Sequence, residues 1–225
     1  MRLIADQFRR SEYPDDDSFW SSKDVCGAVE PPTPLLAAVH YGYTGGLMAK
    51  AFVEHQHRPR KVLDVGSGSG RWLAWYRHLG AEVTGVEVAA ARVKELHDEG
   101  HDVVHADIAD YLAETDSLYD TINAIGVIHH VLPDEKRVRV LNACIDHLLP
   151  EGVLVVGGFF LPWQVQYSGN GDIYKKCWPL RRWRQVMKGC RLHVYRNPIC
   201  RWRSLPQNNI LLVKRSRVSS RDSTL

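Results

Sequence analysis

The sequence contains no long apolar run and no regular set of cysteines. No stretch of about 18 apolar residues occurs, so no membrane-spanning helix is expected. The five cysteines are an odd number, lie far apart and form no Cys-x-x-Cys pair, so neither a disulfide framework nor a zinc site is expected. The first 17 residues lack the apolar segment of a secretory signal, and these absences together predict a cytoplasmic protein.

Acidic residues are missing from one long segment. Between Lys175 and Arg217 there are 13 Lys or Arg residues and no Asp or Glu, whereas residues 1–174 carry 15 basic and 25 acidic side chains. The net charge of +3 conceals this asymmetry. A segment with charges of one sign suggests contact with an anion, although the same residues could form a solvated surface that balances the acidic part.

The rest of the sequence is typical of one α/β domain. With 225 residues, 44% of them hydrophobic, the chain is long enough to bury a substantial core. Short apolar stretches alternate with helical patterns between residues 60 and 157. We predict strands at 61–65, 82–87, 101–105, 119–124 and 152–157, and helices at 72–79, 89–99, 111–114 and 133–149. This alternation predicts a doubly wound, Rossmann-like sheet that is mostly parallel and covered on both faces.

The regions on either side of this alternation have a different character. Residues 1–57 read as an arm and a helical cap, with one helix expected from about Thr44 to His55. Residues 58–217 form the main domain, which contains a cap insert at about 159–190 that is rich in Trp, Tyr and basic residues. Two strands at 191–196 and 209–214 are expected to end the sheet as an antiparallel pair, and residues 218–225 form a polar tail.

The strongest motif is VLDVGSGSG at residues 62–70, where a buried strand ends in a glycine-rich turn. Glycines at 66, 68 and 70 permit unusual backbone angles and let a ligand approach the main chain. The following helix directs free N–H groups toward such a ligand. A dinucleotide-binding fingerprint would need its third glycine at position 71, which is Arg71, so a nucleotide-dependent oxidoreductase is disfavoured.

Two carboxylates follow this motif in register with the predicted strands. Glu87 ends the second strand, 23 residues after Asp64, where a carboxylate can accept hydrogen bonds from both hydroxyls of a ribose. Asp107 follows the third strand, 20 residues after Glu87, and is placed to accept from the exocyclic amine of an adenine. The pair predicts a nucleoside site at the carboxyl edge of the sheet.

At this point the chain resembles the class I S-adenosylmethionine-dependent methyltransferases. The resemblance lies in VLDVGSGSGRW, VTGVEV, VVHADI, YDTINAIGVIHHV and LLPEGVLVV, in that order. The IHHV and PEG stretches are similar to those of quinone-biosynthesis methyltransferases. The resemblance implies S-adenosyl-L-methionine as the cofactor and a final antiparallel strand pair. The cofactor-binding residues that it implies are Asp64, Gly66, Ser67, Gly68, Gly70, Glu87, Val88, Asp107 and Ile108.

Four further side chains are candidates for the reacting end of the site. His129 and His130 follow the fourth predicted strand, where the sulfonium of the cofactor should point, and one of them could be a general base. Alternatively, they are loop histidines that cap the next helix or line the pocket. Tyr43, together with Tyr41, could close over the cofactor as a lid, or both could be helix-edge aromatics.

The acceptor of the methyl group is less constrained by the sequence. The signatures of enzymes that methylate bases in DNA are absent. Enzymes that methylate an exocyclic amine usually carry a (D/N)PP(Y/F) tetrad after the fourth strand, where residues 123–130 read NAIGVIHH. Cytosine-C5 enzymes need a Pro-Cys nucleophile, and no Pro-Cys dipeptide occurs. An aromatic or anionic small molecule is expected, with RNA as the alternative because aromatic residues interleave the basic segment. A non-catalytic scaffold is disfavoured by the intact glycine loop. The aromatic residues that could form an acceptor pocket, or merely pack the insert onto the sheet, are Trp20, Tyr41, Tyr43, Trp163, Tyr167, Tyr174, Trp178 and Trp183.

Overall fold

The computed structural model describes residues 34–158, 165–169, 173–196 and 209–215. The predicted arm before residue 34 and the polar tail at 218–225 lie outside these residues. Within the described ranges, no helix is both long and apolar enough to cross a membrane.

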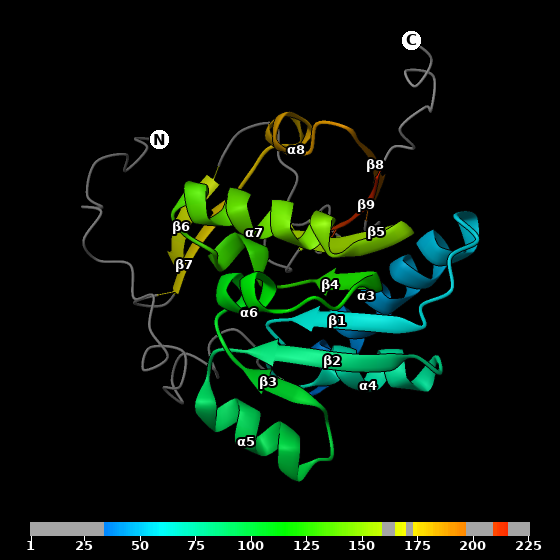
Figure 1. The fold of residues 1–225 in the computed structure, drawn as a ribbon, viewed down its shortest axis with the longest axis vertical. Coiled ribbons are helices and arrows are strands. Elements are labelled where there is room, and N and C mark those ends of the chain that lie inside the picture. The colour runs from blue at the N-terminus through cyan, green and yellow to red at the C-terminus, as the bar shows by residue number, and fades with distance from the viewer. Residues whose placement is uncertain (1–33, 159–164, 170–172, 197–208, 216–225) are drawn as a thin grey trace.

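A seven-stranded sheet with the order β3-β2-β1-β4-β5-β9-β8 forms the centre of the molecule (Figure 1). Strands β1 to β5 pair in parallel, whereas β9 is antiparallel to both of its neighbours, β5 and β8. This confirms the predicted doubly wound sheet with a C-terminal antiparallel pair. The strands are β1 Lys61–Val65, β2 Glu82–Glu87, β3 Val103–His105, β4 Tyr119–Ala124, β5 Leu148–Gly158, β8 Cys190–Tyr195 and β9 Asn209–Arg215.

Helices cover both faces of this sheet. One apolar core joins α3, α4 and α5 to one face, and a second joins α6, α7 and α8 to the other. The alternation of side chains along a strand feeds both cores, since Val62 packs in the first and Leu63 in the second. The helices are α3 Pro34–Glu54, α4 Arg71–His78, α5 Ala90–Asp98, α6 Ile108–Glu114, α7 Asp134–Asp146 and α8 Leu180–Val186.

Several predicted element boundaries were wrong. The helix expected from Thr44 begins at Pro34, and the helix expected to reach residue 149 ends at Asp146. Leu148 belongs to β5 instead, where it is the parallel partner of Tyr119. Helix α6 begins earlier than expected because the side chain of Asp107 accepts a hydrogen bond from the Ala109 N–H and caps the helix.

The predicted insert contains a small sheet and a short helix. Strands β6 Val165–Gly169 and β7 Ile173–Cys177 pair in an antiparallel two-stranded sheet, and α8 follows directly. Arg137 on α7 joins this unit to the main domain, because its guanidinium donates to the Lys176 and His129 carbonyl oxygens at 2.7 and 3.1 Å. The insert is therefore anchored to the loop that follows β4.

Candidate functional site

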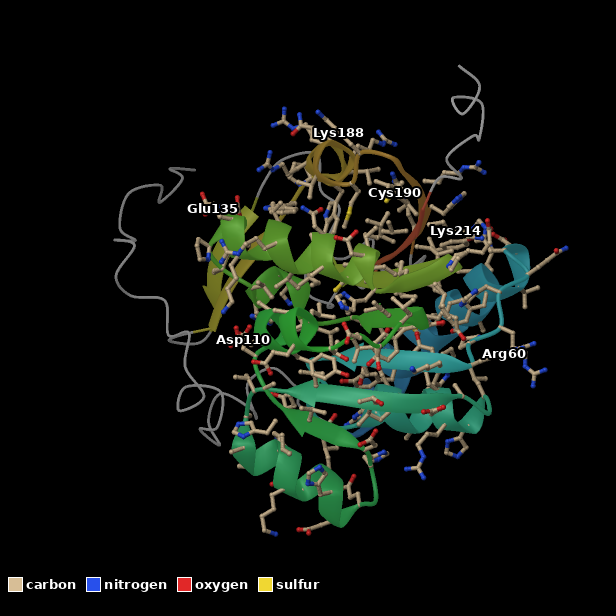
Figure 2. The ribbon with its side chains drawn as sticks, in the orientation of Figure 1. Arg60, Asp110, Glu135, Lys188, Cys190 and Lys214 are labelled. Carbon is tan, nitrogen blue, oxygen red and sulfur yellow. The ribbon has the colours of Figure 1, made fainter. Side chains whose placement is uncertain are left out.

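A cavity lies at the carboxyl ends of the parallel strands, where β1 and β4 are neighbours. The chain runs outward from β1 to β3 and returns to β4, so this is the point at which the strand order reverses. In Figure 2 the labels Asp110 and Glu135 mark this side of the sheet, and Arg60 marks the opposite edge. The cavity is lined by Val65, Gly66, Gly68, Ser69, Val86, Glu87, Val88, Ala89, Arg92, Ala106, Asp107, Ile108, Gly126, Val127, His130, Val131 and Lys136.

The loop after β1 contains three glycines with positive φ angles, Gly66, Gly68 and Gly70, whose surroundings differ. Gly66 and Gly68 line the cavity, and a β-carbon on Gly68 would meet only the Gly66 carbonyl oxygen, at 3.9 Å. Gly70 is buried at the start of α4, where a β-carbon would collide with Leu96. Gly68 therefore has the open position that a ligand needs, whereas Gly70 permits α4 and α5 to approach each other.

Glu87 is held rigidly in the cavity wall by two backbone N–H groups. Its carboxylate accepts a hydrogen bond from Gly68 N at 2.8 Å and one from Ala89 N at 3.0 Å. The side chain is buried, and the residue stands at the end of β2. Each carboxylate oxygen retains further lone-pair capacity, so Glu87 can accept from hydroxyl groups in the cavity without releasing the loop.

Asp107, Ile108 and Val88 line the same cavity, as the register of the motifs predicts. One carboxylate oxygen of Asp107 caps α6, and the other accepts from the ammonium group of Lys136 at 3.0 Å. Sequence reasoning did not identify Lys136, Arg92 or Ser69 as cavity residues. The position of Lys136 in the first turn of a helix that follows β4 is a signal that could have identified it, because that turn lies at the same edge of the sheet.

Asp64 and Ser67 are buried and are not among the residues that line the cavity. Oδ1 of Asp64 accepts from the Asn123 side chain at 2.6 Å, while Oδ2 has no hydrogen-bond partner among the described residues. Burial raises the pKa of Asp64 to about 7, the Asn123 hydrogen bond opposes this rise, and the nearby charge of Glu87 adds to it. An unsatisfied buried carboxylate oxygen fits a cationic group on a bound cofactor. Ser67 donates to the Asp64 carbonyl oxygen at 3.2 Å and holds the loop.

The structure separates the two adjacent histidines. His130 lines the cavity, whereas His129 does not. The carbonyl oxygen of His129 accepts from buried Arg137, and the two imidazole rings lie 4.2 Å apart. If one histidine of this pair touches a bound ligand, the geometry favours His130.

Of the aromatic residues expected near the site, those whose side chains the structure describes lie elsewhere. Tyr43 is 41% exposed on α3 and is absent from the cavity wall, and Tyr41 packs edge-on against Trp72 with ring centroids 5.5 Å apart. Trp178 and Trp183 are buried in the core beside α7, so they are packing residues and not the walls of an acceptor pocket. Trp20 and Trp163, and the side chains of Tyr167 and Tyr174, lie outside the described residues.

The family model and the curated relatives reported below are all named as methyltransferases. A family described as a methyltransferase domain matches residues 63–154. The ubiquinone biosynthesis O-methyltransferase of Idiomarina loihiensis is 34% identical over 140 residues, which are 60% of this chain and 52% of that protein. The probable tRNA methyltransferase 9B of Mus musculus is 31% identical over 110 residues, 48% of this chain and 23% of that protein. The chain thus spans about a quarter to a half of the length of these relatives.

Solved structures with the same fold cover much more of the chain. Magnesium protoporphyrin IX methyltransferase from Synechocystis, solved with bound S-adenosylmethionine, superposes with a TM-score of 0.64 and 14% identity. The superposition covers 89% of this chain and 95% of that one. At this identity the comparison demonstrates a shared fold.

Proposed function

We propose that the chain carries a class I, S-adenosylmethionine-dependent methyltransferase domain and that the whole protein methylates a small-molecule acceptor; the family match at residues 63–154 supports this. We further propose that the cavity at the carboxyl ends of β1, β2 and β4 binds the cofactor, and that the reaction takes place in the cytoplasm. The scattered cysteines, with no repeated spacing, support a reducing compartment.

The position of Glu87 is the observation that carries this proposal. Its carboxylate is buried, fixed by two backbone N–H groups and part of the same cavity wall as Gly68 and Asp107. Burying a carboxylate is costly unless hydrogen bonds satisfy it, and the two N–H groups leave part of its acceptor capacity unused, so this arrangement favours a partner with several hydrogen-bond donors. The two hydroxyls of a ribose are such donors, and Asp107 supplies a second acceptor for an adenine amine.

For this methyl transfer, the main task of the protein is to align the cofactor with the acceptor. S-adenosylmethionine supplies a methyl group on a sulfonium, and the acceptor takes it by in-line displacement. The chain's own residues would hold the ribose through Glu87 and the adenine through Asp107 and Ile108. Asp64, buried outside the cavity lining, would favour the cofactor's amino group by its charge. We propose that His130, which lines the cavity, accepts a proton from an acceptor hydroxyl, thiol or amine.

A small molecule is the favoured acceptor, either anionic or aromatic. The support is the similarity to proteins named ubiquinone biosynthesis O-methyltransferase, three of which are 32–34% identical over parts of this chain. The burial of Trp178 and Trp183 removes part of the sequence argument for an aromatic pocket, so the acceptor class now depends mainly on these relatives.

The test of the cofactor site compares two glycines that both have a positive φ angle, Gly68 with 52° and Gly80 with 82°. Gly68→Val should abolish calorimetric binding of S-adenosylhomocysteine because a branched side chain would enter the cavity. Gly80→Val is the matched control, since Gly80 has a φ of 82° and nothing within 4 Å of a β-carbon, and it lies outside the cavity wall. Both variants carry left-handed strain of about 1–2 kcal/mol. Equal binding by the two folded variants would contradict the proposed site.

Methyl transfer itself is tested with cofactor labelled on the transferred methyl group. Pools of small molecules, RNA and protein are offered separately to the wild-type protein and to Gly68→Val. Label should appear in the small-molecule pool, and only with the wild-type protein. Label confined to RNA or protein would contradict the proposed acceptor class while leaving the cofactor site intact.

RNA is the second candidate acceptor because the basic segment presents exposed cations. Helix α8 and the strand that follows it leave several basic side chains in solvent, and Figure 2 shows Lys188 at the end of the molecule beside α8. A relative is also named a probable tRNA methyltransferase. The exposed basic residues are Arg181, Arg184, Lys188, Arg191 and Arg196.

Salt dependence distinguishes this candidate from the first. For RNA, log K should fall with log salt by about 0.7 for each phosphate neutralised, measured by anisotropy between about 50 and 300 mM salt. The triple change of Arg181, Arg184 and Lys188 to Ala should then flatten the slope. Absence of binding at the low-salt end would remove the support for RNA.

A further inference from the structure

One ion pair in the cavity wall, between Lys136 and Asp107, is largely shielded from solvent. The ammonium group of Lys136 lies 3.0 Å from Oδ2 of Asp107, and the two side chains are only 15% and 28% exposed. By contrast, Lys94 and Asp98 on α5 lie 2.7 Å apart with 78% and 66% of their side chains exposed. Desolvation strengthens the first pair relative to the second, because charges screened by water attract each other weakly.

The pair leaves Asp107 with little freedom to move. Oδ1 accepts from the Ala109 N–H at 2.8 Å, which fixes the carboxylate from the α6 side. Lys136 fixes Oδ2 from the first turn of α7. The carboxylate is therefore held at both oxygens by two different helices, and both Asp107 and Lys136 face the cavity.

The neighbouring charges have other partners. Asp134, in the same turn of α7, accepts from Lys176 at 2.7 Å and from the Trp178 indole at 3.1 Å. Arg92, the other cation of the cavity wall, donates to Glu95 on its own helix at 2.8 Å. Lys136 is thus the cation that the fold directs to the carboxylate of Asp107.

We propose that Lys136 is a positioning residue that sets the selectivity of the cavity for adenine by fixing Oδ2 of Asp107. This inference rests on the proposed cofactor site. A carboxylate that accepts from an ammonium group and a backbone N–H presents acceptor atoms to the cavity. It favours a base with an amine at the position it faces and rejects a base with a carbonyl oxygen there, because two acceptors repel each other.

Selectivity between two nucleoside ligands tests this role. S-adenosylhomocysteine carries an amine on its base, and S-inosylhomocysteine carries a carbonyl oxygen at the same position. Calorimetry should give the wild-type protein a preference of about tenfold to a hundredfold for the adenine ligand. Lys136→Met should narrow this ratio by at least about threefold, mainly by weakening the adenine ligand, because Asp107 then loses one of its two restraints.

Three variants separate selectivity from structure. Asp107→Ala should remove the preference, and adding Lys136→Met to it should change the ratio no further. Lys136→Arg keeps the positive charge and should restore part of the ratio. Lys94→Met, which breaks the exposed pair on α5, should leave the ratio at the wild-type value.

The outcomes distinguish this inference from the proposed function. If Lys136→Met weakens both ligands equally, the pair only ties α6 to α7 and the positioning role is wrong, although the cofactor site stands. If the wild-type protein binds neither ligand, the proposed function and this inference fail together. A narrowed ratio that Lys136→Arg partly restores supports both.

Discussion

The two halves of the sheet gather different residue types for different purposes. In the half formed by β1, β2 and β3, the strands end in glycines and carboxylates that face the cavity. In the half formed by β5, β9 and β8, tryptophans and a buried arginine fill the space between the sheet, α7 and α8. Polar groups are gathered where the parallel strands end, and aromatic groups are gathered where the sheet needs a cover.

In this comparison, Trp178 and Trp183 contribute to the stability of the fold and not to the cavity. Trp178 is 1% exposed and donates from its indole to Asp134 at 3.1 Å, while the Arg137 guanidinium lies 4.7 Å from its ring centroid. Burial lowers the pKa of Arg137 to about 10, and the charge of Asp134 opposes this. The ring thus belongs to a packed, hydrogen-bonded core, although it lies in the part of the chain where the sequence predicts a cap over the acceptor.

The largest expected effect comes from removing that ring. Trp178→Ala should lower the free energy of unfolding by about 3–5 kcal/mol, because a large buried side chain leaves a cavity that cannot fully close. Trp178→Phe should recover part of the loss but not the indole hydrogen bond. Chemical denaturation measures both. If Trp178→Ala were as stable as the wild-type protein and changed only the KM for the acceptor, the ring would belong to the site after all.

The second prediction concerns Asp64, a buried carboxyl group in the half of the sheet formed by β1, β2 and β3. We call this half, which lines the cavity, the binding half. Its folded-state pKa of about 7 lies above the ordinary value of 3.8. Folding therefore favours the protonated form, so the stability contributed by this group is fully present below about pH 4 and is lost as the pH rises through 7. Asp64→Asn should raise the free energy of unfolding at pH 8 by a few kcal/mol, on the order of the shift, and by roughly a third of that at pH 5, because the loss accumulates between about pH 4 and 7.

The difference between wild type and variant isolates Asp64 from other titrating groups. Burial lowers the pKa values of His55 and His57, so these histidines reduce stability in the opposite direction, as the pH falls below about 6.5. Because both proteins share them, their contribution cancels in the difference. A gain at pH 5 equal to the gain at pH 8 would mean that Asp64 is ionised throughout this range in the folded protein.

Much of the binding half could be predicted because its signals are local. Each parallel strand delivers its last residues to the same edge, so the spacing of Gly68, Glu87 and Asp107 along the sequence was sufficient to place them in one cavity. The strands β1, β2 and β4 have the predicted bounds, because nearby glycine or polar residues end each apolar run.

The remaining features depend on contacts between distant residues, and the sequence pattern does not record these. In the sequence, Gly70 cannot be told apart from the other two glycines of the loop. In the fold it faces Leu96, which lies 26 positions later in the chain. Lys136 meets Asp107 only because α6 and α7 begin at one edge. Trp178 reads as a binding aromatic until the fold buries it against α7. The family resemblance supplied the cofactor, which residue spacing alone left open between two classes of nucleotide.

The third prediction contrasts the two edges of the sheet. Glu87 accepts from Gly68 N and Ala89 N at the carboxyl edge, and Asp120 accepts from Arg60 N and Lys61 N at 2.9 and 2.8 Å at the opposite edge. Glu87→Ala should weaken cofactor binding by roughly thirtyfold to a hundredfold, or about 2–3 kcal/mol, because charge-assisted hydrogen bonds are lost. Asp120→Ala, the matched control, should reduce stability and leave calorimetric affinity unchanged. Similar affinities for the two variants would place the ribose away from Glu87.

The smallest expected effect separates the adjacent histidines. His130 lines the cavity and His129 does not, so His130→Ala should lower kcat by about tenfold while cofactor affinity stays constant, and His129→Ala should keep kcat. If His130 takes a proton from the acceptor, the defect should shrink as the pH rises, because the acceptor then loses its proton unaided. A profile of kcat between about pH 6 and 9 for wild type and both variants measures this. A constant defect across that range would indicate that His130 shapes the cavity without accepting a proton, and equal kcat values for all three proteins would leave alignment as the chain's whole contribution.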